Sequence, residues 1–123
     1  MPETLQQTHS LTLADGVASQ PIPLKGVRRV TVFCTNTGAG NAHTYAITVS
    51  GDDSTYVTYN KIITNQANTN GETLVRTATI EPGAVATKFG TMDLENDAYS
   101  SMKVTGTLAT AGTMTAKVVL EYY

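Results

Sequence analysis

The sequence has little of what most metalloproteins and disulfide-rich proteins carry. It contains one cysteine, two histidines and no tryptophan in 123 residues. A single cysteine excludes a framework of disulfide bonds within the chain, and two isolated histidines do not have the spacing of a zinc site. We therefore expect no metal and no cofactor, with stability that comes from packing and from association with other chains.

Charge and hydrophobic runs are also scarce. The net charge of −2 and a pI near 5.5 leave no cluster of basic residues to neutralise phosphates, which argues against a nucleic-acid partner. No apolar run approaches the roughly eighteen residues that span a bilayer, so we expect no membrane partner. The opening residues MPETLQQTHS lack the basic and apolar regions of a secretory signal, and we expect synthesis in the cytoplasm.

The sequence is rich in β-forming residues. Threonine occurs 22 times, whereas leucine is scarce for a helical protein. Period-two alternation places Val30, Val32 and Cys34 on one face of a strand, and the stretch HTYAITVSG alternates in the same way from His43 onward. Such alternation is typical of strands with one buried face.

Turn-forming residues divide the chain into eight extended segments, and no helical stretch of three turns separates them. The segments are 4–13, 27–35, 43–51, 54–64, 72–80, 84–92, 102–105 and 114–122. This pattern predicts an all-β fold, a two-sheet antiparallel sandwich with a jelly-roll-like layout. We expect the last two segments to pair as a hairpin, and 54–64 to be covered on both faces or interrupted by a bulge near Asn60.

The first 25 residues differ from the rest. Pro21 and Pro23 forbid a central strand and indicate a linker or an edge. We predict an extended N-terminal arm with a proline-containing linker over 1–25, and a sandwich body over 26–123.

No set of residues matches a catalytic motif. Cys34 and His43 are conceivable as a nucleophile and base, but they would need an orienting group and an oxyanion donor, so we expect Cys34 to behave as a small buried hydrophobe. Two acidic stretches, Asp52–Asp53 and Asp93 to Asp97, offer oxygens for calcium or for acid and base catalysis. Without an EF-hand pattern they are interpreted as solvated loops, and we predict that the protein is not an enzyme.

Two further groups of residues leave alternatives open. A sugar-binding platform could be built from the tyrosines Tyr45, Tyr56, Tyr59 and Tyr99. Arg28 and Arg29 could anchor a phosphate or carboxylate, although such a pair more often guards a sheet edge.

In composition and layout, the segment MPETLQQTHSLTLADGVASQPIP followed by a β body resembles the small decoration (cement) proteins of tailed bacteriophage capsids. The resemblance implies a virion structural protein on the capsid surface. It implies homotrimers that bridge copies of the major capsid protein and stabilise the shell. The alternative is a carbohydrate- or receptor-binding module of a phage fibre.

An extended arm cannot bury its own leucines, whereas it could add as a strand to the sheet of a neighbouring subunit. We therefore predict a partner interface on the arm and at the terminal tyrosines. It comprises Leu5, Leu11, Leu13, Ile22, Tyr122 and Tyr123.

Overall fold

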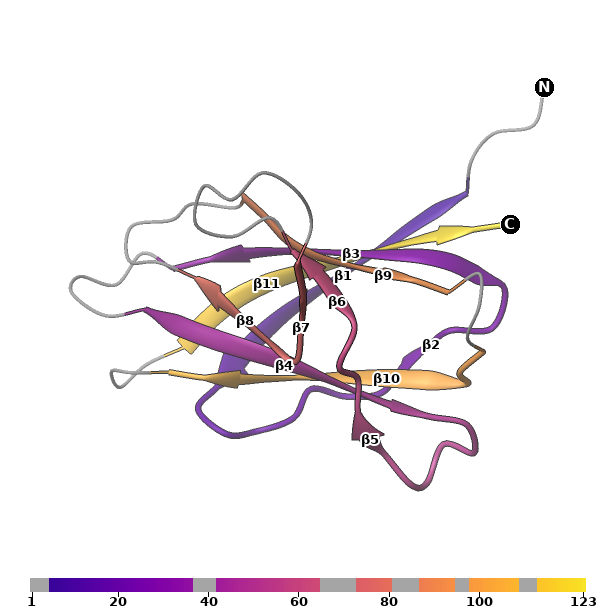
Figure 1. Cartoon of the computed structure of the whole chain (residues 1–123), viewed down its shortest axis with the longest axis horizontal. Helices are drawn as coiled ribbons and strands as arrows, with labels where there is room; N and C mark the ends of the chain where they lie inside the picture. The colour runs from indigo at the N-terminus through magenta and orange to yellow at the C-terminus, as the bar shows by residue number, and fades with distance from the viewer. Residues whose placement is uncertain (1–4, 37–41, 65–72, 81–86, 95–97, 109–112) are drawn as a thin grey trace.

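A computed structural model of the chain describes residues 5–36, 42–64, 73–80, 87–94, 98–108 and 113–123. These residues form eleven β-strands and no helix (Figure 1). The strands are β1 (Gln6–Ala14), β2 (Ile22–Pro23), β3 (Val27–Thr35), β4 (His43–Ser50), β5 (Val57–Thr58), β6 (Ile62–Thr64), β7 (Thr73–Val75), β8 (Thr77–Ile80), β9 (Thr87–Asp93), β10 (Ser101–Thr107) and β11 (Thr113–Tyr122). The prediction of an all-β fold is confirmed.

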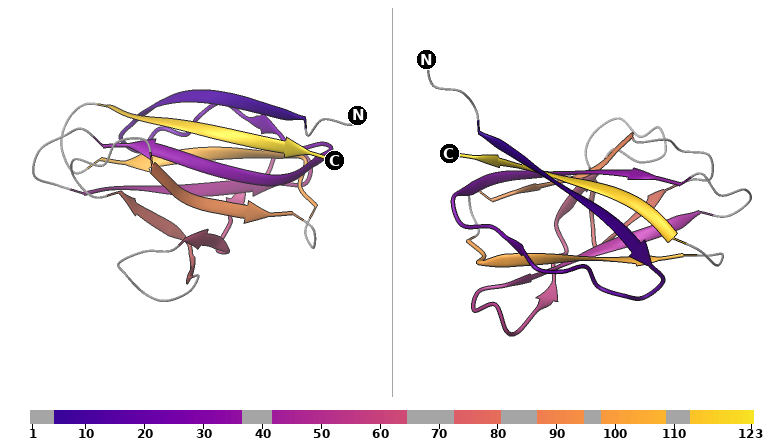
Figure 2. Two further views of the ribbon diagram at one scale, coloured as in Figure 1. Left: turned by 90° about the horizontal axis from the view of Figure 1, so that it is seen from above. Right: turned by 180° about the vertical axis from the view of Figure 1, so that it is seen from behind.

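The strands form two antiparallel sheets that pack face to face (Figure 2). One sheet has the order β1-β11-β3-β9-β6-β7, and the other has the order β2-β10-β4-β5, with β8 also paired to β4. From β1 to β4 and from β8 to β11, successive strands alternate between the two sheets, which is the winding of a jelly roll. The predicted two-sheet sandwich is confirmed.

The core lies between the sheets and is built by the predicted alternation. Val30, Val32 and Cys34 of β3 are fully buried, and Tyr45 and Ile47 of β4 face them from the other sheet. Because inward and outward side chains alternate along a strand, each strand contributes every second residue to this core.

The predicted hairpin at the end of the chain is wrong. β10 pairs with β4 from Ser101 to Thr107, whereas β11 lies in the other sheet between β1 and β3. Alternation determines which face of a strand is buried but leaves open which strand is its neighbour, and here the two strands face each other across the core.

Two of the eight predicted segments cross from one sheet to the other. Segment 54–64 divides into β5 and β6, with Tyr59 buried between them and its backbone N–H donating to the Ile47 carbonyl at 2.8 Å. Segment 72–80 divides at Arg76 into β7 and β8. The expected bulge near Asn60 is therefore a crossing between sheets. The eight predicted segments become eleven strands because two of them divide and β2 is added.

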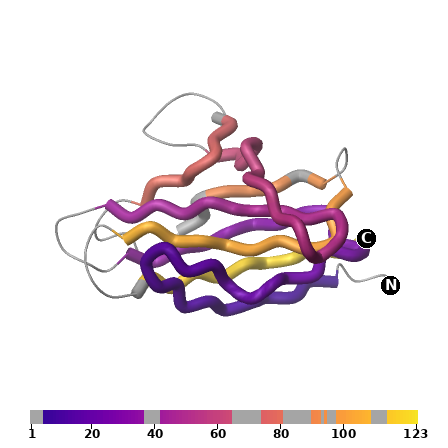
Figure 3. The backbone as a smooth tube through the Cα atoms, turned by 90° about the horizontal axis from the view of Figure 1, so that it is seen from below, coloured from indigo at the N-terminus to yellow at the C-terminus, as the bar shows by residue number. Residues whose placement is uncertain are grey.

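The predicted N-terminal arm is part of the sandwich over the described residues. β1 pairs with β11 of the same chain along its whole length, from Gln6–Glu121 to Ala14–Thr113. The following segment runs beside β10, through the bridge Ala18–Thr105 and the short strand β2 (Figure 3). Pro21 precedes the edge strand β2 and Pro23 ends it, which agrees with one of the two expected alternatives, an edge. Leu13 and Ile22 contact this chain's own core, so a neighbouring subunit is not needed to bury them.

Candidate interaction surface

The structure separates the six predicted interface residues into two groups. Leu13 and Ile22 are only 1% and 2% exposed and belong to the core, and Leu11 packs against that core. This corrects the assignment of Leu13 and Ile22 to a partner interface. Leu5, Tyr122 and Tyr123 lie together at one corner of the sandwich.

The terminal corner, defined here as Leu5, Tyr122 and Tyr123, joins the start of β1 to the end of β11. The Tyr122 N–H donates to the Leu5 carbonyl at 2.9 Å, and the Tyr122 hydroxyl donates to Gln7 Oε1 at 2.7 Å. These bonds fix the backbone, while the side chains of Leu5 and Tyr123 are 61% and 77% exposed. Two large apolar side chains are thus exposed to solvent on a backbone that is fixed by hydrogen bonds.

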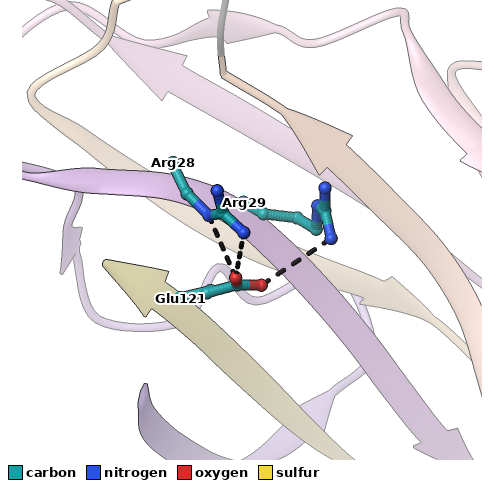
Figure 4. Close-up of polar contacts among 3 residues, drawn as sticks. All are labelled: Arg28, Arg29 and Glu121. Atoms are coloured by element: carbon teal, nitrogen blue, oxygen red, sulfur yellow. Dashed lines mark hydrogen bonds and ion pairs between the residues drawn. The ribbon is translucent and has the colours of Figure 1, made fainter. Parts of the chain in front are cut away.

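Glu121, the residue that precedes Tyr122, binds two arginines of β3 (Figure 4). Arg28 Nε donates to Glu121 Oε1 at 2.9 Å and Arg28 Nη2 contacts the same oxygen, while Arg29 Nη1 lies 3.7 Å from Glu121 Oε2. Both arginines remain partly exposed. They sit on β3, an interior strand between β11 and β9, so the expectation that this pair guards a sheet edge is wrong.

The free edge of β1 was not identified from the sequence. β1 is the outermost strand of its sheet (Figure 2), and no other described strand pairs with its far side. Its nine residues, QQTHSLTLA, contain no Asp, Glu, Lys, Arg or proline. That composition was the available signal, because natural edge strands are commonly protected by charges, prolines or bulges.

A groove of about 320 Å³ lies on the outer face of the same sheet, beside this edge. Half of its eight lining residues bear hydroxyl groups, and the partly buried ring of Phe33 and the exposed Lys117 also line it. The lining residues are Ser10, Leu11, Thr12, Phe33, Thr35, Thr115, Ala116 and Lys117. Hydroxyls, a ring and an ammonium group could bind a small polar ligand.

The acidic loop after β4 is held by its own hydrogen bonds. The backbone N–H groups of Thr55 and Ser54 and the Ser50 hydroxyl donate to Asp52 Oδ1 at 2.8 to 2.9 Å. These bonds hold the pKa of Asp52 below its usual value near 3.8. Hydrogen bonds from Ser101 and Ser100 lower the pKa of Asp53 in the same way. The carboxylates stabilise the loop.

The other acidic stretch, Asp93 to Asp97, falls largely outside the described residues. Within the described residues, no group of three His, Cys, Asp or Glu side chains could hold a metal ion. None of the described segments forms a helix with the length and hydrophobicity of a membrane span.

Burial makes Cys34 a poor nucleophile. Loss of solvation raises the pKa of the Cys34 thiol to about 12, so the reactive thiolate is scarce at neutral pH. Burial likewise raises the pKa of Tyr45.

The tyrosines considered as a sugar platform do not form one. Tyr45 and Tyr59 are core residues, and Tyr99 meets the Tyr59 ring edge-on with ring centres 6.1 Å apart. Lys103 Nζ lies 4.2 Å from the ring centre of Tyr56 and covers it. These four tyrosines therefore serve packing first.

Fold and surface together define an all-β jelly-roll sandwich with a nine-residue free edge at β1 and an exposed terminal corner. No protein-family model and no curated protein sequence matches this chain. Among solved structures, the crystal structure of the SPBc2 prophage-derived protein YomS is similar to it, with a TM-score of 0.57 and 13% sequence identity over 98% of each chain. At this identity the similarity shows a common fold.

Proposed function

We propose that this chain is a virion structural protein, a decoration or cement protein that binds and stabilises the major capsid shell of a tailed bacteriophage. The observation that carries the proposal is the terminal corner. Leu5 and Tyr123 expose apolar side chains there, and two partly exposed arginines bind Glu121, the residue that precedes Tyr122. Aromatic residues and arginine are enriched at protein–protein interfaces and among their energetic hot spots.

Two further observations support this proposal. Among the residues considered for catalysis, Cys34 and His43 are buried and Asp52 accepts hydrogen bonds from its own loop, which fits a protein that is not an enzyme. The fold is similar along nearly its whole length to that of a prophage-derived protein. We propose that the chain acts as a homo-oligomer on the capsid surface, after synthesis in the host cytoplasm, with the major capsid protein as its partner and without nucleic acid, membrane or cofactor.

The test uses particles of the phage or prophage that encodes the chain, prepared without it. Wild-type protein should co-sediment with these shells and raise their melting temperature. The double variant Leu5→Ser/Tyr123→Ser should bind at least about 30-fold more weakly, because loss of a hot spot costs about 2 kcal/mol or more.

Val57→Ser is the matched control, because Val57 is 59% exposed but lies on β5 in the other sheet. It should bind like the wild type. Absence of the protein from purified particles, or equal binding by the double variant, would contradict the proposal.

The groove beside β1 favours a second candidate function, that of a carbohydrate- or receptor-binding module of a phage fibre. Phe33 could stack on a sugar ring while the surrounding hydroxyls bind its oxygens. Binding on a glycan array that is lost in Phe33→Ala, without any binding to shells, would support this candidate over the capsid protein.

A further inference from the structure

We propose that two copies of this chain pair through their β1 strands, antiparallel and centred on Ser10, so that their six-stranded sheets become one continuous sheet. As a description of the oligomer of a capsid protein, the inference rests on the proposed function. The pairing itself is measured without a capsid. A two-fold pairing gives a dimer, in contrast to the trimer that the resemblance implies.

The backbone of β1 has hydrogen-bonding groups left for such a partner. The Tyr122 N–H donates to the Leu5 carbonyl, so Leu5 and Tyr122 form a hydrogen-bonded pair of the β1–β11 ladder. Such pairs alternate with non-bonded ones along an antiparallel ladder. The N–H and C=O groups of Thr8, Ser10 and Thr12 therefore point to the free edge, where no described strand meets them.

The side chains of these residues suit a second copy. A two-fold axis at Ser10 places Ser10 opposite its copy and Thr8 opposite Thr12, all on the outer face of the sheet, where they are exposed. Cross-strand pairs of hydroxyl residues are favourable, whereas like charges directly opposite one another would oppose pairing. β1 contains no Asp, Glu, Lys or Arg, so no acidic or strongly basic side chain on the strand repels its copy.

Lys117 is the charged residue directly beside Ser10 on β11. In the pair, the two copies of Lys117 are three strand spacings apart, about 14 Å at 4.7–4.9 Å per spacing. This exceeds the screening length of about 8 Å at physiological salt, so their repulsion is weak.

The other edges of the two sheets are less suited to pairing. β2 and β5 have two residues each, β7 has three and β8 has four. β2 also follows Pro21 and ends in Pro23. Short strands and prolines protect an edge. Among the described strands, β1 combines an outer position with a length of nine residues.

The experiment measures solution mass by light scattering from micromolar to millimolar concentration. Wild-type protein should approach twice the chain mass of 13.0 kDa. Ser10→Lys should weaken the dimer by about fivefold or more, because two lysines then face each other at the axis. Ser10→Glu should do the same, and an equal mixture of the two variants should restore a mixed dimer.

The matched control is Thr115→Lys, which places the same charge on the same outer face but on β11, one strand in from the edge. It should dimerise like the wild type. Circular dichroism confirms that each variant is folded. If either variant is less stable, the mixture still tests the pairing, because the mixed dimer brings opposite charges together at the axis.

A wild-type monomer or trimer would overturn the inference, and so would a dimer that Ser10→Lys leaves intact. If the wild type is monomeric in solution but Ser10→Lys loses shell binding, the edge takes a strand of the capsid protein instead of a second copy. In that case this inference fails while the proposed function stands. If the protein is a dimer that binds no shell, this inference stands and the proposed function fails.

Discussion

Gly90 and Tyr45 meet across the core, one from each sheet. A Cβ atom on Gly90 would collide with the Tyr45 hydroxyl oxygen and lie 2.7 Å from Cγ2 of Ile62. That hydroxyl is buried without a hydrogen-bond partner among the described residues. The glycine therefore provides the space into which the end of the Tyr45 side chain fits.

Gly90→Ala should lower the free energy of unfolding by about 1–3 kcal/mol, because the added methyl group overpacks this contact. Tyr45→Phe should be neutral or slightly stabilising, since it removes a buried hydroxyl that lacks a partner. In the double variant, Phe at position 45 should recover part of the loss. Urea denaturation of the four proteins measures this coupling, and strictly additive effects would show that the two residues do not share the contact.

At this scale, the sequence predicted burial well. Alternation alone assigned Val30, Val32 and Cys34 to the core, and this is confirmed. It could not identify the role of Gly90, because a close approach between two sheets depends on which strands face each other. The same lack of pairing information led Leu13 to be assigned to a partner, although it is buried in its own chain.

For whole strands, the sequence predicts where each strand lies along the chain but leaves open which sheet it joins. The extended segments were located correctly, but the crossings between sheets at Tyr59 and Arg76 were not recognised. Strand propensity is local, whereas membership of a sheet depends on partners far along the chain. β1 was likewise assigned to an arm and not to the body, although an edge strand with one solvated face needs few apolar residues.

Removal of residues 1–20, which would be harmless for a free arm, should abolish cooperative folding. It deletes β1, exposes one side of β11 and removes Leu13 from the core. Point variants separate these roles. Leu13→Ala should cost about 2–5 kcal/mol, whereas Leu5→Ala, at an exposed position, should change the unfolding free energy little. Thermal unfolding followed by circular dichroism checks this, and a truncated chain that melts like the wild type would contradict it.

The loop after β4 should depend on pH through Asp52. Its pKa is lowered in the folded chain, so the carboxylate stabilises the loop above its usual pKa near 3.8, and this stabilisation is lost as the pH falls through the lower, folded pKa. The amide NMR signals of Ser54 and Thr55 should titrate with a midpoint below 3.8. Asp52→Asn should remove this titration, and Asp53→Asn should leave it in place. A midpoint at or above the usual value would contradict the hydrogen-bonded loop.

The whole molecule is held together by contacts between distant parts of the chain. β1 pairs with β11, and β4 with β10, so both sheets join early and late segments. The sequence predicted the sandwich, since composition and alternation decide its class. It left the strand order open, because that order is a property of all the strands together.

Refolding should accordingly be slow for a chain of this size. Closing long loops costs entropy before the paired strands compensate for it, and β-sandwiches typically refold in milliseconds to seconds. Stopped-flow fluorescence after dilution from urea measures this rate. A refolding time of microseconds would show that local contacts dominate folding.

The hydrogen bond between Leu5 and Tyr122 also determines how the molecule bears mechanical force. β1 and β11 are antiparallel, and the start of one lies beside the end of the other. Tension applied at residues 5 and 123 would load the hydrogen bonds of this ladder one after another, so that β1 separates from β11 starting at one end. Tension applied along both strands in opposite directions would load many bonds at once. The sandwich should therefore yield easily when pulled by its two ends and resist when it is sheared along its strands.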